Sequence, residues 1–302
     1  MAIDINRGTS GVIKLPAEVS SEIWSNTLEN SAVQARARKV ALPAGGLTIP
    51  MITGDPEAGW VNETDEKPVS DSKFGSKVMT PYKMAVIELF SDEFRRDLPG
   101  LYAELVRRLP YALGRKFDKA ALGIEEAPGT GFDTLADAPE IALDGTIKPF
   151  LSGLKSVAAN KGVVDGWTLT EEARVDALNI ADSMNRPLLV SDYSTAGQVG
   201  TILGKPVSTT RAIDGSNVAG FAGEWSSAVW GAVEDIQIDI NDRGSVTRGG
   251  EQINLWQRNM FAVRAEIEVG FVLRDPKRFV KFTSAGDSGA GESGSGDSGA
   301  GA

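Results

Sequence analysis

The sequence of 302 residues contains neither histidine nor cysteine. Disulfides, thiolate metal sites and cysteine nucleophiles are therefore excluded, and the commonest general base and zinc ligand are missing. The formal net charge of −10 argues against a dedicated nucleic-acid binder, although it does not exclude a protein that encloses nucleic acid. No apolar run is long enough to span a bilayer, and the N-terminal residues lack the basic and then apolar pattern of a signal sequence.

The first 50 residues indicate an extended arm that contains one short helix near residues 16–28. Ile23, Trp24 and Leu28 have the spacing of one helical face. Gly45 and Gly46, with a proline on either side, mark a turn between two short strands. An arm with so few core residues usually needs a partner surface to order it.

Residues 55–83 form a long polar stretch that contains few residues able to fill a core. Its acids include Glu57, Glu63, Asp65 and Glu66. Trp60 and Phe74 are the side chains that would contact a neighbour. Because loops of this length are uncommon inside compact domains and are usually functional or disordered, we expect this one to pack on an adjacent subunit.

An apolar strand over residues 84–90 precedes the longest regular element that we expect, a helix over residues 98–123. An apolar residue recurs every four positions along this helix and gives it one apolar face: Leu101, Leu105, Leu109, Leu113, Phe117 and Ala121. The other faces carry Arg107, Arg108, Arg115, Lys116, Asp118 and Lys119. Pro110 predicts a bend rather than a break, because the apolar face continues on both sides of it.

Helices and strands are expected to alternate over residues 140–222. One helix is predicted around residues 150–158, and a second begins after Thr170 and follows a strand. A short buried strand is predicted at 187–190, and a turn at 204–206 leads into another strand.

The last third of the chain is predicted to consist mainly of strands. Residues 220–233 form a pair of strands that carries Trp225 and Trp230. The next strand has Val233, Ile236, Ile238 and Ile240 as its apolar set. Residues 253–274 are the strongest strand candidate, either two strands or one long bent strand, and a short final strand follows.

These elements, in this order, resemble the major capsid protein family of tailed bacteriophages, which has the Hong Kong 97-like fold. The resemblance covers residues 60–282 and rests on segments 74–123, 220–231 and 258–282, with Gly-Thr-Gly at 129–131. It implies an α+β fold of five parts: an N-terminal arm with entry strands (1–50), an extended β-hairpin loop (51–83), a peripheral domain with a spine helix (84–134, completed by 223–283), an axial α/β domain (135–222) and a flexible Gly/Ser/acidic tail (284–302).

The resemblance implies a structural protein rather than an enzyme, with no cofactor and no membrane association. It would self-assemble in the bacterial host cytoplasm into the pentamers and hexamers of an icosahedral virion shell around phage double-stranded DNA. The implied partners are a portal, a decoration protein and a separate scaffolding protein, the last because the chain begins almost directly with the arm. Three alternative functions remain. An encapsulin-type nanocompartment shell has the same fold, and the other two alternatives are an unrelated structural protein and an enzyme.

The candidate subunit-interface residues are Trp60, Phe74, Arg107, Arg108, Arg115 and Lys116. We hypothesise that the four cations of this set form ion pairs with the loop acids of a neighbouring subunit. Alternatively, these four cations are solvated surface charges that each contribute little to stability or assembly.

The resemblance also implies a crosslink, because some members of the family join their subunits by an isopeptide bond between a lysine and an asparagine, assisted by a glutamate. The matching positions here are Lys77, Asn259 and Glu266. A carboxylate buried among Phe261, Val263 and Val269 would have a raised pKa and accept the lysine proton more readily. Alternatively, Asn259 bonds backbone, Glu266 pairs with a nearby arginine, and Lys77 is a solvated lysine.

Overall fold

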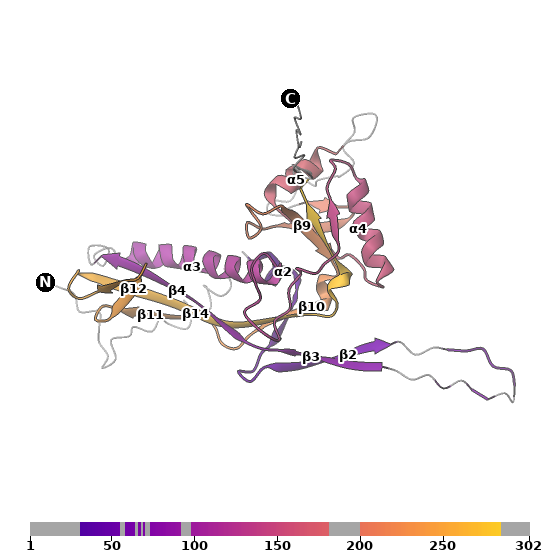
Figure 1. The fold of residues 1–302 in the computed structure, drawn as a ribbon, viewed down its shortest axis with the longest axis horizontal. Coiled ribbons are helices and arrows are strands. Elements are labelled where there is room, and N and C mark those ends of the chain that lie inside the picture. The colour runs from indigo at the N-terminus through magenta and orange to yellow at the C-terminus, as the bar shows by residue number, and fades with distance from the viewer. Residues whose placement is uncertain are drawn as a thin grey trace, which may run out of the picture.

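The computed structural model describes residues 31–54, 58–63, 66–67, 69, 73–91, 98–180 and 200–284. The predicted helix near 16–28, the predicted strand at 187–190, the tail beyond 284 and the loop acids Glu57 and Asp65 lie outside these residues. Figure 1 shows an elongated part that follows α3, a second folded part at one end of it, and a hairpin that projects from the junction.

The elongated part is built on a five-stranded sheet with β14 (Met260–Leu273) at its centre. One edge of β14 pairs antiparallel with β4 (Tyr82–Ser91). The other edge pairs first with β11 (Gln237–Asn241) and then with β10 (Ala228–Ala232), which in turn pairs parallel with β1 (Arg38–Ala41). Ile236, Ile238 and Ile240 are buried, as the alternation of apolar residues predicts.

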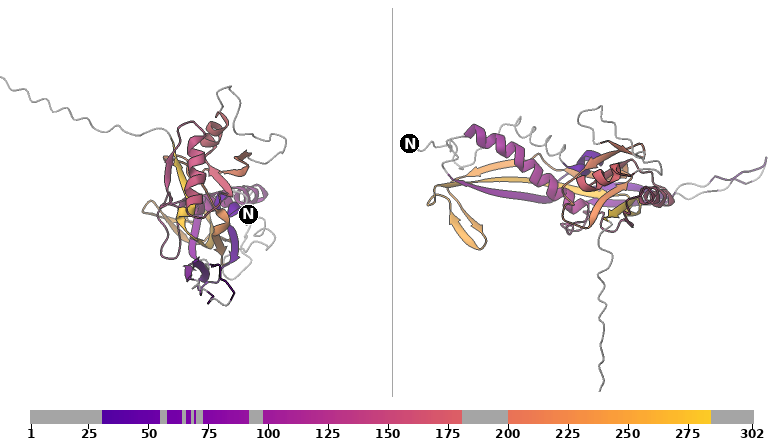
Figure 2. Two further views of the ribbon diagram at one scale, coloured as in Figure 1. Left: turned by 90° about the vertical axis from the view of Figure 1, so that its right-hand side faces the viewer. Right: turned by 90° about the horizontal axis from the view of Figure 1, so that it is seen from above.

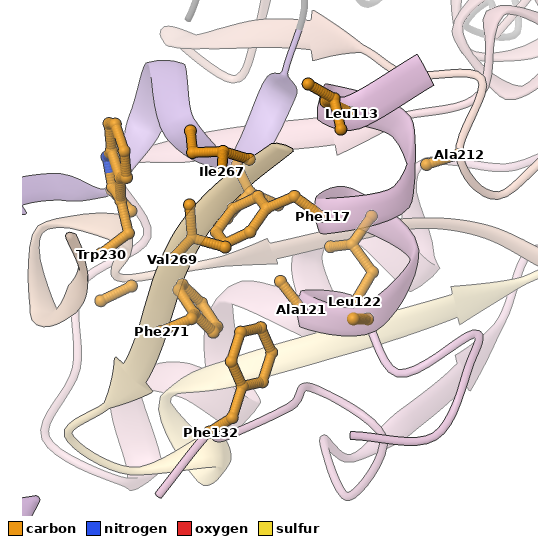
Figure 3. Close-up of a cluster of buried hydrophobic side chains, with 14 of the residues drawn as sticks. Leu113, Phe117, Ala121, Leu122, Phe132, Ala212, Trp230, Ile267, Val269 and Phe271 are labelled. Atoms are coloured by element: carbon orange, nitrogen blue, oxygen red, sulfur yellow. The ribbon is translucent and has the colours of Figure 1, made fainter. Parts of the chain in front are cut away.

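The spine helix is confirmed as α3 (Leu98–Ala121), which continues through Pro110 and lies along the sheet (Figure 2). Phe117 lies at the centre of the larger core, with its ring centroid 5.9 Å from that of Phe271 and 6.2 Å from that of Phe132 (Figure 3). Leu113 and Ala121 are also buried. Asp118 lies off the apolar face, as predicted, but it is only 1% exposed, because helix α2 (Ala32–Arg36) covers that side of α3.

The second part is a six-stranded sheet with helices α4 (Lys148–Ala159) and α5 (Glu171–Leu178). Its strands are, in spatial order, β5 (Glu140–Ala142), β15 (Phe279–Thr283), β9 (Val218–Gly223), β6 (Gly166–Leu169), β8 (Lys205–Thr209) and β7 (Thr201–Ile202). Phe150, Trp167 and Phe282 lie in a second core. Thr170 begins α5 as predicted, because its side chain accepts a hydrogen bond from the backbone N–H of Ala173.

Two features of the last third differ from the prediction. The strands β9 and β10 do not pair with each other, because the short helix η2 (Trp225–Ser227) between them carries the chain from one sheet to the other. The final strand β15 follows η3 (Pro276–Arg278) and returns to the six-stranded sheet. The segment 223–283, which we assigned to the peripheral domain, therefore contributes to both sheets.

Residues 253–274 form two strands rather than one. The first of them lies within β13 (Glu251–Asn254), which pairs with β12 (Ser245–Arg248) in a separate two-stranded hairpin. The second is β14.

The projecting hairpin consists of β2 (Leu47–Gly54) and β3 (Lys73–Met79). The predicted turn at Gly45 and Gly46 precedes it. The hairpin begins at Leu47, so the predicted start of the extended loop at residue 51 falls inside strand β2. In the described part of the chain, no helix has the length and apolar character needed to cross a membrane.

A candidate subunit interface

The hairpin β2–β3 has two different faces. Directly opposed residues of an antiparallel pair share a face, so the register assigns each side chain to one side. The inner face carries Ile49 and Met79 and packs on Val229 and Val272 of the five-stranded sheet. The outer face is exposed along its whole length: Thr48, Pro50, Ile52, Phe74, Ser76 and Val78.

This outer face is apolar to a degree unusual for a solvated strand pair. Phe74 is 77% exposed, and its cross-strand neighbour Ile52 is 54% exposed. Trp60, in the connection beyond the strands, is fully exposed at 105%. Contiguous exposed apolar surface marks contact sites for other proteins, so the outer face of the hairpin is the best-defined candidate interface of this chain.

The two strands of the hairpin are fixed by polar contacts to the body of the subunit. The Nζ of Lys77 donates to Oδ2 of Asp133 at 2.6 Å, and the same oxygen accepts the backbone N–H of Leu273 at 2.9 Å. On the other strand, Nη2 of Arg274 donates to the carbonyl oxygen of Ile52 at 3.0 Å. These contacts hold both strands, so the hairpin leaves the body in a defined direction.

The Gly-Thr-Gly turn at 129–131 supports the same junction. The N–H of Thr80 donates to the carbonyl oxygen of Gly131 at 3.0 Å. Gly131 has a φ of +84°, and a Cβ added there would lie 2.4 Å from Oγ1 of Thr80. Glycine is therefore required both by the backbone conformation and by the close approach of the chain that enters β4.

The predicted cations of the spine helix have different surroundings. Arg108 and Arg115 are exposed, whereas the side chain of Arg107 lies outside the described residues. Lys116 has a partner in its own chain: it donates to Glu125, which Lys119 also approaches at 3.6 Å. The Lys116 ammonium lowers the pKa of Glu125. Lys116 is thus already paired within the subunit.

The three residues of the predicted crosslink lie in separate environments of one chain. Lys77 is at the hairpin base, and Asn259 is exposed in the turn before β14, with a φ of +49°. Asparagine adopts this left-handed conformation more readily than most residues, which gives Asn259 a local structural role. The prediction concerns residues of different subunits, so a single chain does not test it.

The side chain of Glu266 is only 16% exposed, but its expected apolar surroundings are wrong. Side chains alternate along β14, so Phe261, Val263 and Val269 face the core while Glu266 faces the other way. Its carboxylate lies 3.6 Å from Nζ of Lys83 and 3.7 Å from Nε of Arg264. Glu266 is therefore surrounded by cations rather than by apolar side chains.

Sequence reasoning missed two residues that hold the hairpin, Asp133 and Arg274. Both bind partners more than 50 positions away, so no local pattern identifies them. A groove of about 490 Å³ lies beside the hairpin and is lined by Arg274, Ile49, Met51 and Val272 among others. In the described part of the chain, no three acidic side chains are grouped as a metal would require.

Comparison with solved structures defines the class of fold. The chain superposes on a protein of Gordonia phage Cozz with a TM-score of 0.68 and 22% identity, over 85% of this chain and 87% of that chain. It also superposes on the "Capsid of empty GTA particle computed with C5 symmetry", with a TM-score of 0.60 and 12% identity, over 93% and 95% of the two chains. The fold is that of phage capsid subunits.

Sequence comparison gives the family. The model of the phage capsid family matches residues 11–284. The "Probable major capsid protein gp17" of Mycobacterium phage D29 is 30% identical over 302 residues, which cover 91% of each chain. The chain belongs to the phage capsid family. This confirms the predicted resemblance and the prediction of a structural protein rather than an enzyme, and these relatives give no support to the encapsulin-type alternative.

Proposed function

We propose that this chain is the major capsid protein of a phage and that copies of it associate to form the virion shell. The observation that carries the proposal is the family match over residues 11–284, supported by the relative of phage D29 that is named as a major capsid protein. The exposed apolar face of the hairpin is consistent with it, since that face has a natural partner in a second copy of the chain.

The shell is proposed to be icosahedral, built from pentamers and hexamers, and to enclose double-stranded DNA. A solved relative in fold comes from a capsid described with C5 symmetry, which is the symmetry of a pentamer. The net charge of −10 suits containment of DNA without sequence-specific binding. A scaffolding protein, a portal and a decoration protein are the proposed partners, and the host cytoplasm is the proposed place of assembly.

The parts of the chain receive corresponding roles. We assign the hairpin and its connection, near 51–83, to the extended loop that packs on a neighbouring subunit. The five-stranded sheet with α3 is the proposed peripheral domain, and the six-stranded sheet is the proposed axial domain. The arm (1–50), which includes α2 and β1, and the Gly/Ser/acidic tail (284–302) are proposed as the two remaining parts. Each contact can be moderate, because a closed symmetric shell repeats it many times.

The test is electron microscopy of the protein expressed with its neighbouring genes. We expect closed shells of uniform diameter from the unaltered chain. The double variant Ile52→Ser with Phe74→Ser should yield a folded subunit that forms no shells, because these two side chains are exposed in the subunit and form a cross-strand pair on the outer face.

Val163→Ser is the matched control. Val163 is an exposed apolar residue (67% exposed), but it follows α4 and is not part of the hairpin. Normal shells from the double variant would refute the role of the outer face. The absence of any shell from the unaltered chain with its neighbouring genes would refute the proposed function itself.

A further inference from the structure

One buried carboxylate joins three segments of the chain. Asp118, on α3, accepts hydrogen bonds from Oγ of Ser31 at 2.6 Å and from the backbone N–H groups of Ala32 and Val33 at 3.0 and 3.3 Å. Oγ1 of Thr210, in the chain after β8, donates to it at 3.3 Å. Asp118 therefore satisfies the first N–H groups of α2 and attaches that helix to the spine helix.

The other end of α2 is attached to the six-stranded sheet. Nε of Arg36 donates to Oγ of Ser208 on β8 at 2.8 Å. The guanidinium also lies against Gly166 on β6, where an added Cβ would be only 2.5 Å from Nη1. Val33 belongs to the core around α3. A helix of five residues thus bridges the two sheets of the subunit.

The contact between α2 and the six-stranded sheet is incompletely satisfied. Oε1 of Gln34 and Oγ1 of Thr168 are buried without a hydrogen-bond partner in the described part of the chain. Thr168 is directly opposite Phe221 and Ser208 in the sheet, which places it on the face that Arg36 contacts. Buried polar groups without partners weaken a contact, so α2 is held chiefly by its two polar anchors.

The charge on Asp118 has no cation within ion-pair distance among the residues that the structure describes. A pocket that reaches Asp118 is lined by charged and titratable groups of three elements: Tyr111 and Arg115 on α3, Glu171 at the start of α5, and Arg211 in the chain after β8. On α2, Arg36 faces Ser208. Arg174 lowers the pKa of Glu171, so Glu171 stays charged over the range in which Asp118 titrates.

We propose that α2 is a proton-sensitive clamp between the two sheets, which closes more firmly when Asp118 is protonated and opens more readily when Asp118 is charged. The inference concerns the single subunit and does not depend on the proposed function. In the closed clamp, a proton from solvent resides on one carboxyl oxygen, whose O–H donates to the hydroxyl of Ser31 or Thr210. When the protonated oxygen is Oδ1, the proton lies between it and Oγ of Ser31, and Oδ2 continues to accept the N–H of Ala32 and the hydroxyl of Thr210.

The direction follows from burial. Desolvation raises the pKa of Asp118 from 3.8 to about 6 while α2 covers it. If α2 opens, water reaches the carboxylate and its pKa returns toward 3.8, so the open form loses the proton first as pH rises. Stability of the closed clamp is therefore greatest below pH 3.8 and is lost as pH rises to about 6, above which it is constant.

Hydrogen–deuterium exchange on the full-length protein tests this. The reporters are the amides of residues 32–37, with exchange rates corrected for the intrinsic effect of pH. Between pH 4.5 and pH 7.5 we expect the opening equilibrium constant of this segment to rise roughly 25-fold. Amides of α4 serve as the internal control and should show no such rise.

Two variants separate the clamp from general loosening. Asp118→Asn removes the titration and should abolish the pH dependence, whereas Thr210→Val removes the hydroxyl that bonds Asp118 and the N–H of Ala212 and should raise opening at every pH while the dependence persists. An unchanged dependence in Asp118→Asn would overturn the proposal. If that variant does not fold, the unaltered protein decides, since an opening constant that stays flat between pH 4.5 and pH 7.5 excludes the clamp.

Discussion

Lys77 and Asp133 are 56 positions apart in the sequence, yet the lysine Nζ lies 2.6 Å from the aspartate Oδ2. The same oxygen accepts the N–H of Leu273 at the end of β14. One carboxylate therefore links the projecting hairpin to the central strand of the five-stranded sheet. Both side chains are 31% exposed, so the ion pair itself contributes at most about 1 kcal/mol. Its main effect is on the direction of the hairpin.

The first prediction concerns this link. Asp133→Ala should lower the free energy of unfolding by about 1–3 kcal/mol, because it removes the ion pair and leaves the N–H of Leu273 without its acceptor. Lys77→Met removes only the ion pair and should lower it by less than about 1 kcal/mol. Urea denaturation measures both. Asp137→Ala is the control, since Asp137 is exposed in the same loop; an equal loss there would contradict the role of Asp133.

The second prediction concerns the core beneath the spine helix. Phe117 is fully buried and makes ring contacts with Phe132, Phe271 and Trp230. Phe117→Ala should lower the free energy of unfolding by about 3–5 kcal/mol, since it removes a large side chain and leaves a cavity. Tyr111→Ala on the same helix should change it by less than about 1 kcal/mol, because Tyr111 is 49% exposed. Similar losses for both variants in urea denaturation would disprove this assignment.

Elements with a local sequence pattern were predictable. The four-residue repeat that includes Leu113, Phe117 and Ala121 identified α3, and Thr170 identified the start of α5 because its capping hydrogen bond spans three residues. The alternation along β14 also placed Phe261 and Val263 in the core. Extended to Glu266, three positions after Val263, the same alternation shows that Glu266 faces away from them.

Elements that depend on distant contacts were not predictable. Burial of Asp118 requires α2, whose Ala32 lies 86 positions earlier, and helical spacing alone gives no sign that this face of α3 is covered. The separation of β9 and β10 into two sheets depends on their partners β15 and β14, not on the glycine-rich segment itself. A sequence pattern specifies which face of a strand is buried, but not which strand lies beside it.

The third prediction tests the charge hypothesis at the spine helix. Arg115 is exposed, and it is a better probe than Lys116, which is already paired with Glu125. If Arg115 contacts the acidic loop of a neighbouring subunit, Arg115→Glu should reduce the yield of shells, and the combination with Glu63→Lys and Glu66→Lys should restore it. Lys116→Glu serves as the comparison. Unaltered shell yield from Arg115→Glu would show that this charge is merely solvated, as the alternative holds.

The last prediction concerns the isopeptide bond between Lys77 and Asn259 of different subunits. The reaction requires Lys77 to leave Asp133 and its ammonium group to lose a proton, because only the neutral amine is a nucleophile. Its amine would then attack the side-chain carboxamide of Asn259, form one C–N bond and release ammonia. To accept the proton from Lys77, the Glu266 carboxylate would have to leave its contacts with Lys83 and Arg264. Each step becomes feasible when a neighbouring subunit displaces these partners on assembly.

Denaturing electrophoresis of mature shells decides whether this happens. The crosslink predicts ladders of covalent oligomers that vanish in Lys77→Arg, because the guanidinium is not a nucleophile at neutral pH, although it keeps the charge facing Asp133. Asn259→Asp should also abolish the ladders while leaving the turn before β14 intact, since aspartate tolerates the same left-handed conformation. Lys83→Arg is the control and should leave them unchanged. A single band near 32 kDa from mature shells would exclude the crosslink and leave Lys77 with its structural role at the hairpin base.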